Sequence, residues 1–290
     1  MSQMHLFTKR LNRRRLGDQL MTGILTLCAL LSAGVLVLIL GYVTLRGLPA
    51  LNLSFFTERP LPYGEVGGGV APAIIGTLLM LAIAALISVP IGIAAAIYLA
   101  EYGRGRLATT IRFVIELLAG LPSIVVGVFV WALVVRQIVG NYSGIAGALA
   151  LAIIIIPIVT RTAEEMIRLV PDTLREASFA LGVRRWRTIL LVVLPTARAG
   201  LVTGTVLALA RAGGETAPLL LTALGNQFFN LDLTQPMAAL PLQIYTYAVS
   251  PYDDWHTKAW GSALILIVVI GLFSLLTRIV ATRSQVRGSN

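Results

Sequence analysis

The feature that most constrains this chain is the length of its apolar runs, since residues 66–100 contain no charged side chain. A helix needs about 20 apolar residues to cross the ~30 Å hydrocarbon core of a bilayer. Lipid offers no partner for backbone N–H and C=O groups, so a crossing segment satisfies them within itself, as a helix does. Charged residues make up 12% of the chain, about half the fraction usual in soluble domains. The sequence therefore predicts an all-α, polytopic membrane protein.

Six membrane spans account for the apolar runs without a leftover segment. The first run, residues 19–45, is longer than the roughly 7–15 residues of a signal-peptide core, so we expect it to be retained. Pro90 falls inside the second run and predicts a kink there, and Pro122 falls inside the third. The expected spans cover approximately residues 19–45, 74–99, 113–135, 144–160, 195–224 and 259–276.

Basic residues alternate between the two sides of these spans. Of the 23 lysines and arginines, 18 lie in segments that the six spans place on one side, residues 1–18, 101–112, 161–198 and 278–290. Basic loops face the cytoplasm. We therefore expect a multi-pass protein of the cytoplasmic (inner) membrane with both termini and the 161–198 segment in the cytoplasm, and the 225–257 loop outside. The net charge of +10 is then a topology signal and predicts no nucleic-acid partner.

Residues suited to metal or nucleotide chemistry are scarce. Cys28 is the only cysteine, and the two histidines, His5 and His256, are far apart, so we expect no metal and no cofactor on this chain. A nucleotide-binding P-loop needs Gly-x4-Gly-Lys-Ser/Thr. The two lysines, Lys9 and Lys258, are followed by Arg and Ala. The chain is therefore predicted not to be an enzyme, and any ATP chemistry belongs to another chain.

The charged segment between the fourth and fifth spans contains a predicted cytoplasmic helix. Pro171 and Asp172 are typical of a helix start, and Gly182 is typical of a helix end. One face carries small and apolar residues at helical spacing, namely Leu174, Ala177, Ser178 and Leu181. An amphipathic helix in water buries such a face. The surface that covers it is either the protein's own span ends or another protein.

The spacing within this segment resembles a known motif. Glu176-Ala177-Ser178, three residues, Gly182, nine residues, then Val192-x-Leu194-Pro195 is similar to the EAA loop of ABC importer permeases, with Ser178 and Val192 as small departures. The resemblance implies the type I (MetI-like) permease fold. It also implies that the 172–187 helix docks on a separate ATPase, which carries ATP and Mg, through Glu176, Ala177, Ser178 and Gly182.

A second charged motif, Arg211-Ala212-Gly213-Gly214-Glu215, lies inside the expected fifth span. At ~1.5 Å per residue, Arg211 is roughly 18 Å beyond Ala199. An arginine at mid-span costs about 2.5–3.5 kcal/mol. Residues four apart on a helix share a face, so Arg211 and Glu215 could form a buried structural ion pair. Alternatively, the two residues line a translocation path.

Several motifs from about residue 67 to the end resemble the phosphate-specific branch of the same family, the PstA-type permeases. The resemblance implies a translocation path that includes Arg211, Glu215, Thr216 and Arg161. It also implies a second homologous permease, two cytoplasmic ATPase subunits and a periplasmic phosphate-binding protein as partners. The guanidinium fork suits any oxyanion, so phosphate rests on the resemblance. The motifs are Gly120-Leu-Pro-Ser123, Arg161-Thr-Ala-Glu-Glu165, Leu169-Val-Pro171, Thr216-Ala-Pro218 and Ala239-Leu-Pro-Leu-Gln-Ile-Tyr245.

These observations divide the chain into three parts. Residues 1–65 form a cytoplasmic tail, the first span and an outer loop, residues 66–281 form a permease core, and residues 282–290 form a cytoplasmic tail. Alternatives stay open: a permease for another oxyanion, the paired permease of the same importer, or a membrane anchor without transport. An autonomous secondary transporter is a further class, although the sequence has no obvious inverted repeat.

Overall fold

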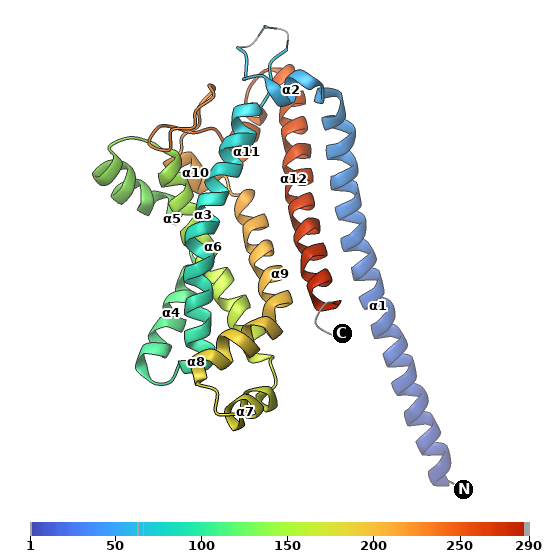
Figure 1. Ribbon diagram of the computed structural model, residues 1–290. Helices are drawn as coiled ribbons and strands as arrows, with labels where there is room; N and C mark the ends of the chain where they lie inside the picture. The colour runs from blue at the N-terminus through green and yellow to red at the C-terminus, as the bar shows by residue number, and fades with distance from the viewer. Residues whose placement is uncertain (1, 63, 66, 287–290) are drawn as a thin grey trace.

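The computed structural model describes residues 2–62, 64–65 and 67–286, and these ranges fold into helices joined by loops, with no strand (Figure 1). The α-helices are α1 (Ser2–Gly47), α2 (Leu53–Thr57), α3 (Ala71–Ile97), α4 (Arg106–Gly120), α5 (Ser123–Val130), α6 (Gly144–Arg168), α7 (Asp172–Ala180), α8 (Arg185–Thr188), α9 (Leu194–Gly213), α10 (Ala217–Thr222), α11 (Leu240–Ala248) and α12 (Asp253–Val286). Four short helical segments join them, a 3-10 turn at Leu48–Ala50 and π-helices at Tyr98–Tyr102, Trp131–Val139 and Ile189–Val193. The all-α prediction is confirmed.

Among the described residues, five helical stretches are long and apolar enough to cross a membrane, and a bent pair of helices brings the total to as many as six. The five are Gly17–Ala50, Ala71–Tyr102, Gly144–Arg168, Arg185–Gly213 and Asp253–Leu272. Five of the expected spans thus fall on these helices, although their bounds differ. Pro90 lies inside α3 without ending it.

The expected third span, residues 113–135, falls on the bent pair of helices. The chain bends by 103° between Arg106–Gly120 and Ser123–Val139. Leu121 and Pro122 at the bend have ψ angles of 135° and 134°, which are extended rather than helical. A proline disfavours the helical conformation of the residue before it. Pro122 is therefore the local cause of the break.

The expected fifth span, 195–224, also differs from the structure. Its helix ends at Gly213, and α10 forms a separate short helix beyond the break. At the other end, helical structure begins at Arg185 and continues through the π-helical segment into α9. Pro195 lies in the first turn of α9, as expected.

The core forms where α3, α6 and α9 pack against one another. Glycines permit the close approach, as in other membrane bundles. A Cβ atom added at Gly92 of α3 would lie 2.8 Å from Val159 of α6. At Gly204 of α9 it would lie 2.7 Å from the Thr162 hydroxyl of α6. The three helices therefore pack as a tight unit.

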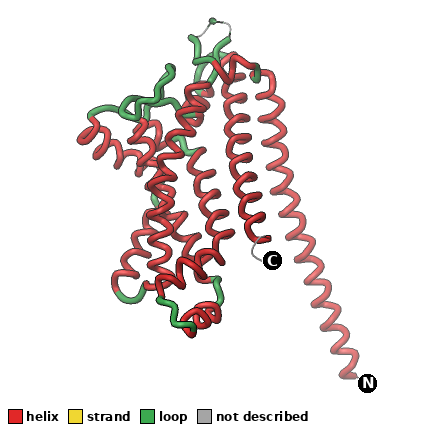
Figure 2. The backbone as a smooth tube through the Cα atoms, viewed as in Figure 1, coloured by secondary structure: helices red, strands yellow, loops and turns green. Residues whose placement is uncertain are grey.

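Helix α1 stands apart from this unit and runs beside α12 (Figure 1). None of the most apolar stretch of Gly17–Ala50 is buried within the chain. The tube view shows α7 and its flanking loops toward the end of the molecule at which α1 starts, and α12 ends short of them (Figure 2). Residues 287–290 of the predicted C-terminal tail lie outside the described residues.

The opposite end of the bundle is closed by the segment between α10 and α11. Three backbone carbonyls of this region accept hydrogen bonds from the first N–H groups of α6. The pairs are Ser143 N to Thr222 O at 2.9 Å, Gly144 N to Gln235 O at 3.0 Å and Ile145 N to Leu233 O at 2.9 Å. These bonds satisfy donors that a helix start leaves without intrahelical partners. They fix the loop over the end of α6.

Candidate functional site

The segment that resembles an EAA loop folds as two short helices joined by a turn. Helix α7 begins at Asp172, directly after Pro171, as predicted. Gly182 has φ +74°, the left-handed conformation that glycine adopts without steric cost and that commonly ends helices. The chain then enters α8. The 172–187 segment is therefore a helix–turn–helix rather than one helix.

The face that the sequence predicted to be buried is only partly covered by the chain itself. Ser178 is buried and its hydroxyl lies 2.8 Å from that of Thr188, which holds α7 against the end of α8. Leu174 and Leu181 are 40% and 84% exposed. Phe179 is exposed as well. Large apolar side chains on a short exposed helix mark a surface that another molecule covers.

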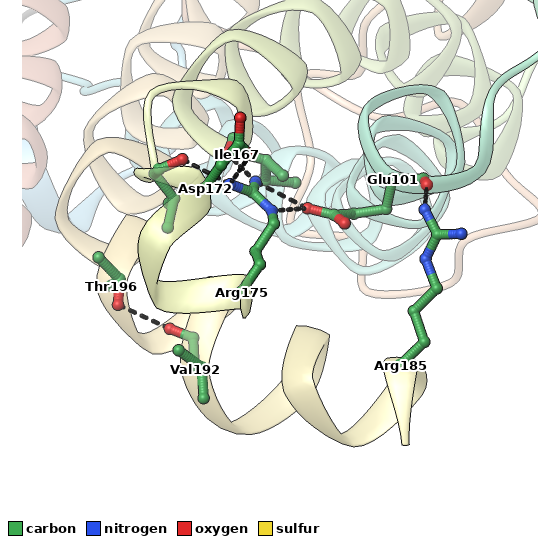
Figure 3. A network of polar contacts seen from close by, with 8 residues as sticks. Glu101, Ile167, Asp172, Arg175, Arg185, Val192 and Thr196 are labelled. Atoms are coloured by element: carbon green, nitrogen blue, oxygen red, sulfur yellow. Dashed lines mark hydrogen bonds and ion pairs between the residues drawn. The ribbon is translucent and has the colours of Figure 1, made fainter. Parts of the chain in front are cut away.

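Arg175 points the other way, into the protein (Figure 3). Its Nε and one terminal nitrogen donate to the same oxygen of Glu101, at 3.0 and 2.8 Å. Other bonds reach the carbonyl of Ile167 at 2.9 Å, that of Val170 at 2.5 Å and the carboxylate of Asp172 at 3.1 Å. The Arg175 and Glu101 side chains are 14% and 6% exposed. The sequence analysis missed this pair, whose partners are 74 positions apart.

A second arginine reaches the same place from α8. The Arg185 guanidinium donates to the backbone carbonyl of Glu101 (Figure 3) and lies 4.6 Å from the centre of the Tyr102 ring. A cation over an aromatic face is attracted by the ring quadrupole. Both helices of the loop are thus attached to the π-helical turn Tyr98–Tyr102 that follows α3.

A mixed-charge cavity of about 210 Å³ lies beside the inner ends of α4 and α6. Glu164 accepts from Arg112 at 3.1 Å and from Arg168 at 2.6 Å. Arg161 is exposed, and its Nε lies 3.9 Å from the Glu165 carboxylate. The cavity is lined by Leu99, Arg112, Ile115, Glu116, Arg161, Glu164, Glu165 and Arg168. Arg161, predicted for the translocation path, thus belongs to this cluster and not to a group with Arg211.

Arg211 lies at the outer end of α9, and its side chain is exposed on the isolated chain. Figure 1 shows α9 ending well short of the ends of α3 and α12 that lie near α2, and Arg211 is in the last turn of α9. The helix ends at Gly213, which places Glu215 and Thr216 in the break before α10. Within the described residues no ion pair joins Arg211 to Glu215. The interpretation of a buried structural ion pair is therefore wrong, because the helical spacing it needs is lost at Gly214.

The break after α9 lies against the bent pair of helices. A Cβ atom added at Gly127 of α5 would lie 2.8 Å from the Cα of Pro218, the second residue of α10. Non-helical backbone at membrane depth is tolerated where it is buried in protein or lines a cavity. Sequence reasoning missed this juxtaposition, although both breaks carry a proline, Pro122 and Pro218, as a signal.

Two groups at the end of the molecule opposite α7, Asp232 and Tyr247, have shifted pKa values. Hydrogen bonds from the hydroxyl and backbone N–H of Thr234 lower the pKa of Asp232 and order the loop around it. Burial raises the pKa of Tyr247 to about 12. The Tyr247 phenol is thus neutral at physiological pH, and neither group offers acid–base chemistry near neutrality.

Comparisons with known proteins agree with this architecture. A family model described as "Binding-protein-dependent transport system inner membrane component" matches residues 88–287. The phosphate transport system permease protein PstA of Pasteurella multocida (strain Pm70) is 46% identical over 92% of this chain and 95% of its own length. The protein of the same name from Yersinia pestis is 45% identical over 86% of this chain and 85% of its own.

Among solved structures, an inward-facing conformation of the MetNI methionine ABC transporter is similar to this chain, with a TM-score of 0.60 and 21% identity. The similarity covers 74% of this chain and 94% of that chain. At this identity it concerns the fold alone.

Proposed function

The chain belongs to the family of binding-protein-dependent transport system inner-membrane components, and from that premise we propose how it works within a phosphate importer. It is a membrane-spanning subunit of a phosphate ABC importer, with the fold of type I importer permeases. It is a transporter component and not an enzyme. The observation that carries the proposal is the exposed helix–turn–helix of α7 and α8 at one end of a helical bundle. In the same bundle, the apolar helix α9 carries the exposed Arg211.

The exposed side of α7 and α8 is the docking surface for a cytoplasmic ATPase. Phe179, Leu181 and Trp186 are exposed there, at 44%, 84% and 50%. Burying apolar side chains at an interface is favourable by roughly 25 cal/mol per Å². Glu176 is exposed on the same helix. Two ATPase subunits, which bind ATP and Mg, would serve this chain and a second permease.

A second permease covers the membrane face that this chain leaves open. Arg211 is exposed on α9, a helix long and apolar enough to cross a membrane, whereas lipid satisfies the bare apolar face of α1. An arginine facing lipid costs several kcal/mol, whereas one that lines a polar path between two subunits does not. An autonomous secondary transporter is disfavoured on the same ground, since one chain alone leaves Arg211 unshielded.

Arg211, Glu215, Thr216 and Arg161 contribute to the phosphate path. The first three lie at or next to the helix break, where backbone groups and side chains are free to face a polar passage. Arg161 lies at the opposite end of the bundle, in the mixed-charge cavity. A bidentate guanidinium matches phosphate oxygens. A periplasmic phosphate-binding protein delivers phosphate at the end formed by α2, α11 and the 225–239 loop.

The membrane orientation follows from the charge distribution. Both termini and the α7–α8 loop face the cytoplasm, and the 225–239 loop faces the outside of the cytoplasmic membrane. This orientation puts the docking surface where ATP is available.

The test is to purify the tagged chain from its native host in mild detergent and to reconstitute what co-elutes. Co-elution of a P-loop ATPase and a second permease, with ATP-dependent phosphate uptake into liposomes, is the expected result. Uptake of sulfate or molybdate in place of phosphate would reassign the substrate. A chain that elutes alone and transports alone would contradict the assignment to an ABC importer.

A further inference from the structure

Helix α3 is held at both ends by segments that the proposed function assigns to opposite sides of the membrane. At one end it is bonded to the α7–α8 loop, and at the other to residues 237–240. We propose that α3 is the link that passes movement of the ATPase-docking loop to the outer segment, with Glu101 and Thr77 as the two joints. This inference rests on the proposed function.

The inner joint is the buried pair of Glu101 with Arg175. Two guanidinium nitrogens converge on one carboxylate oxygen, at 2.8 and 3.0 Å, and such charge-assisted bonds are stronger and more directional than neutral ones. Arg175 also holds the carbonyls of Ile167 and Val170 at the end of α6. Arg185 adds a bond to the Glu101 carbonyl from α8. The loop, α3 and α6 therefore meet at one arginine.

The outer joint is a backbone-to-side-chain bond at the start of α3. The buried Thr77 hydroxyl accepts from the N–H of Leu240 at 2.7 Å and donates to the carbonyl of Ala73, also at 2.7 Å. Beside it, a Cβ atom added at Gly76 would lie 2.1 Å from the carbonyl oxygen of Ala238. The outer segment thus rests directly on the α3 backbone.

Between the joints, α3 and the π-helical turn Tyr98–Tyr102 that follows it form one helical stretch, Ala71–Tyr102, which packs closely on α6 at Gly92. Densely packed helices shift as units rather than deform. The alternative routes differ in kind: α9 is interrupted at Gly213 and the α4–α5 pair is bent by 103°. Helix α6 is also continuous, but the backbone of residues 169–171 connects it covalently to α7. Only side chains join α3 to the loop, so this link can be cut by single substitutions.

The experiment measures phosphate imported per ATP hydrolysed by the reconstituted complex, supplied with phosphate-loaded binding protein. Glu101→Ala removes the acceptor for Arg175, whereas Glu101→Gln keeps an oxygen that can accept the same bonds. Thr77→Val removes the hydroxyl at nearly constant volume, whereas Thr77→Ser keeps it. We expect the ratio to fall about tenfold for the Ala and Val variants, as for loss of a buried hydrogen bond. The Ser variant should stay within about twofold of wild type. The Gln variant should lose less than the Ala variant, because it keeps an acceptor oxygen for Arg175 but not the charge.

Wild-type ratios in both Glu101→Ala and Thr77→Val would overturn the proposal, and so would equal losses within each matched pair. If Glu101→Ala fails to assemble, the Thr77 pair decides alone, and equal ratios for Val and Ser overturn the link. A wild-type complex that assembles but imports no phosphate would instead contradict the proposed function, so the two failures are distinguishable.

Discussion

Arg211 supports, at the scale of one residue, the proposal that this chain works together with a partner subunit. It lies in the last turn of α9, is exposed, and within the described residues has no ion pair with Glu215. A charged side chain facing hydrocarbon there costs about 2.5–3.5 kcal/mol. The cost disappears when the side chain faces a hydrated passage shared with a partner subunit.

The first prediction concerns this arginine. Arg211→Ala should reduce phosphate uptake by at least about 100-fold, since a buried bidentate anion contact is worth roughly 3 kcal/mol, while the complex still co-elutes. Uptake into cells or liposomes measures the effect. Arg106→Ala is the control, because Arg106 is exposed at the start of α4. Normal uptake by Arg211→Ala would show that the residue does not line the path.

The second prediction concerns the docking surface. Glu176→Lys reverses the charge of an exposed residue on α7 and should weaken ATPase association about tenfold or more, as for loss of a charged interface contact. Helical content and membrane insertion should not change, because Glu176 makes no described contact within the chain. Co-purification of the ATPase is the measurement. Asn141→Lys adds a cation at an exposed position in the loop before α6, away from the docking surface, and serves as the control.

Residue-level reasoning from the sequence located Arg211 and Glu176 because their surroundings are unusual. An arginine amid apolar residues and an anchored Glu-Ala-Ser spacing are visible without a structure. The Arg175–Glu101 pair could not be predicted from the sequence, because its partners are 74 positions apart. Taken separately, each residue also has the sequence context of an ordinary solvated charge. Contacts of that kind follow from how helices pack, which local patterns do not specify.

At the scale of elements, helix breaks shape the centre of the protein. The bend at Pro122 and the break at Gly213–Gly214 lie against each other through α5 and α10. The hydropathy of a segment reports how apolar it is but not whether its backbone bends. It therefore predicted the third and fifth spans and missed the break within each. Proline alone was an ambiguous signal, since Pro90 is accommodated within α3 while Pro122 ends α4.

The third prediction tests the contact between these breaks. Gly127→Ala places a methyl group 2.8 Å from the Cα of Pro218, and overpacking of this kind destabilises by roughly 1–3 kcal/mol. The thermal midpoint of the purified complex should fall. Gly271→Ala in α12 is the control, because its methyl group meets nothing within 4 Å in the chain. Equal midpoints for the two variants would argue against tight α5–α10 packing.

At the scale of the whole molecule, the two ends of the bundle carry different segments. The α7–α8 loop lies toward the end at which α1 starts, and α2, α11 and the 225–239 loop occupy the other end. The sequence predicts that these two ends face opposite sides of the membrane, because the distribution of basic residues acts over the entire chain and does not depend on where each helix bends.

The fourth prediction follows from this arrangement. A green fluorescent reporter fused after Asn290 should fluoresce and a phosphatase fused there should be inactive, since both readouts report a cytoplasmic C-terminus. A phosphatase inserted in the outer loop after Asn230 is the reciprocal control and should be active. The opposite pattern would invert the proposed orientation and remove the docking surface from the compartment that holds ATP.

The exposed Arg211 on α9 has a consequence for the cell that makes the protein. When a fold is completed by another subunit, its stability depends on the concentration of that subunit. Copies synthesised in excess of the second permease would remain as orphans, with Arg211 facing lipid, and would be substrates for membrane quality-control proteases. We therefore expect the amount of this chain in the membrane to follow the supply of its partner more closely than its own rate of synthesis.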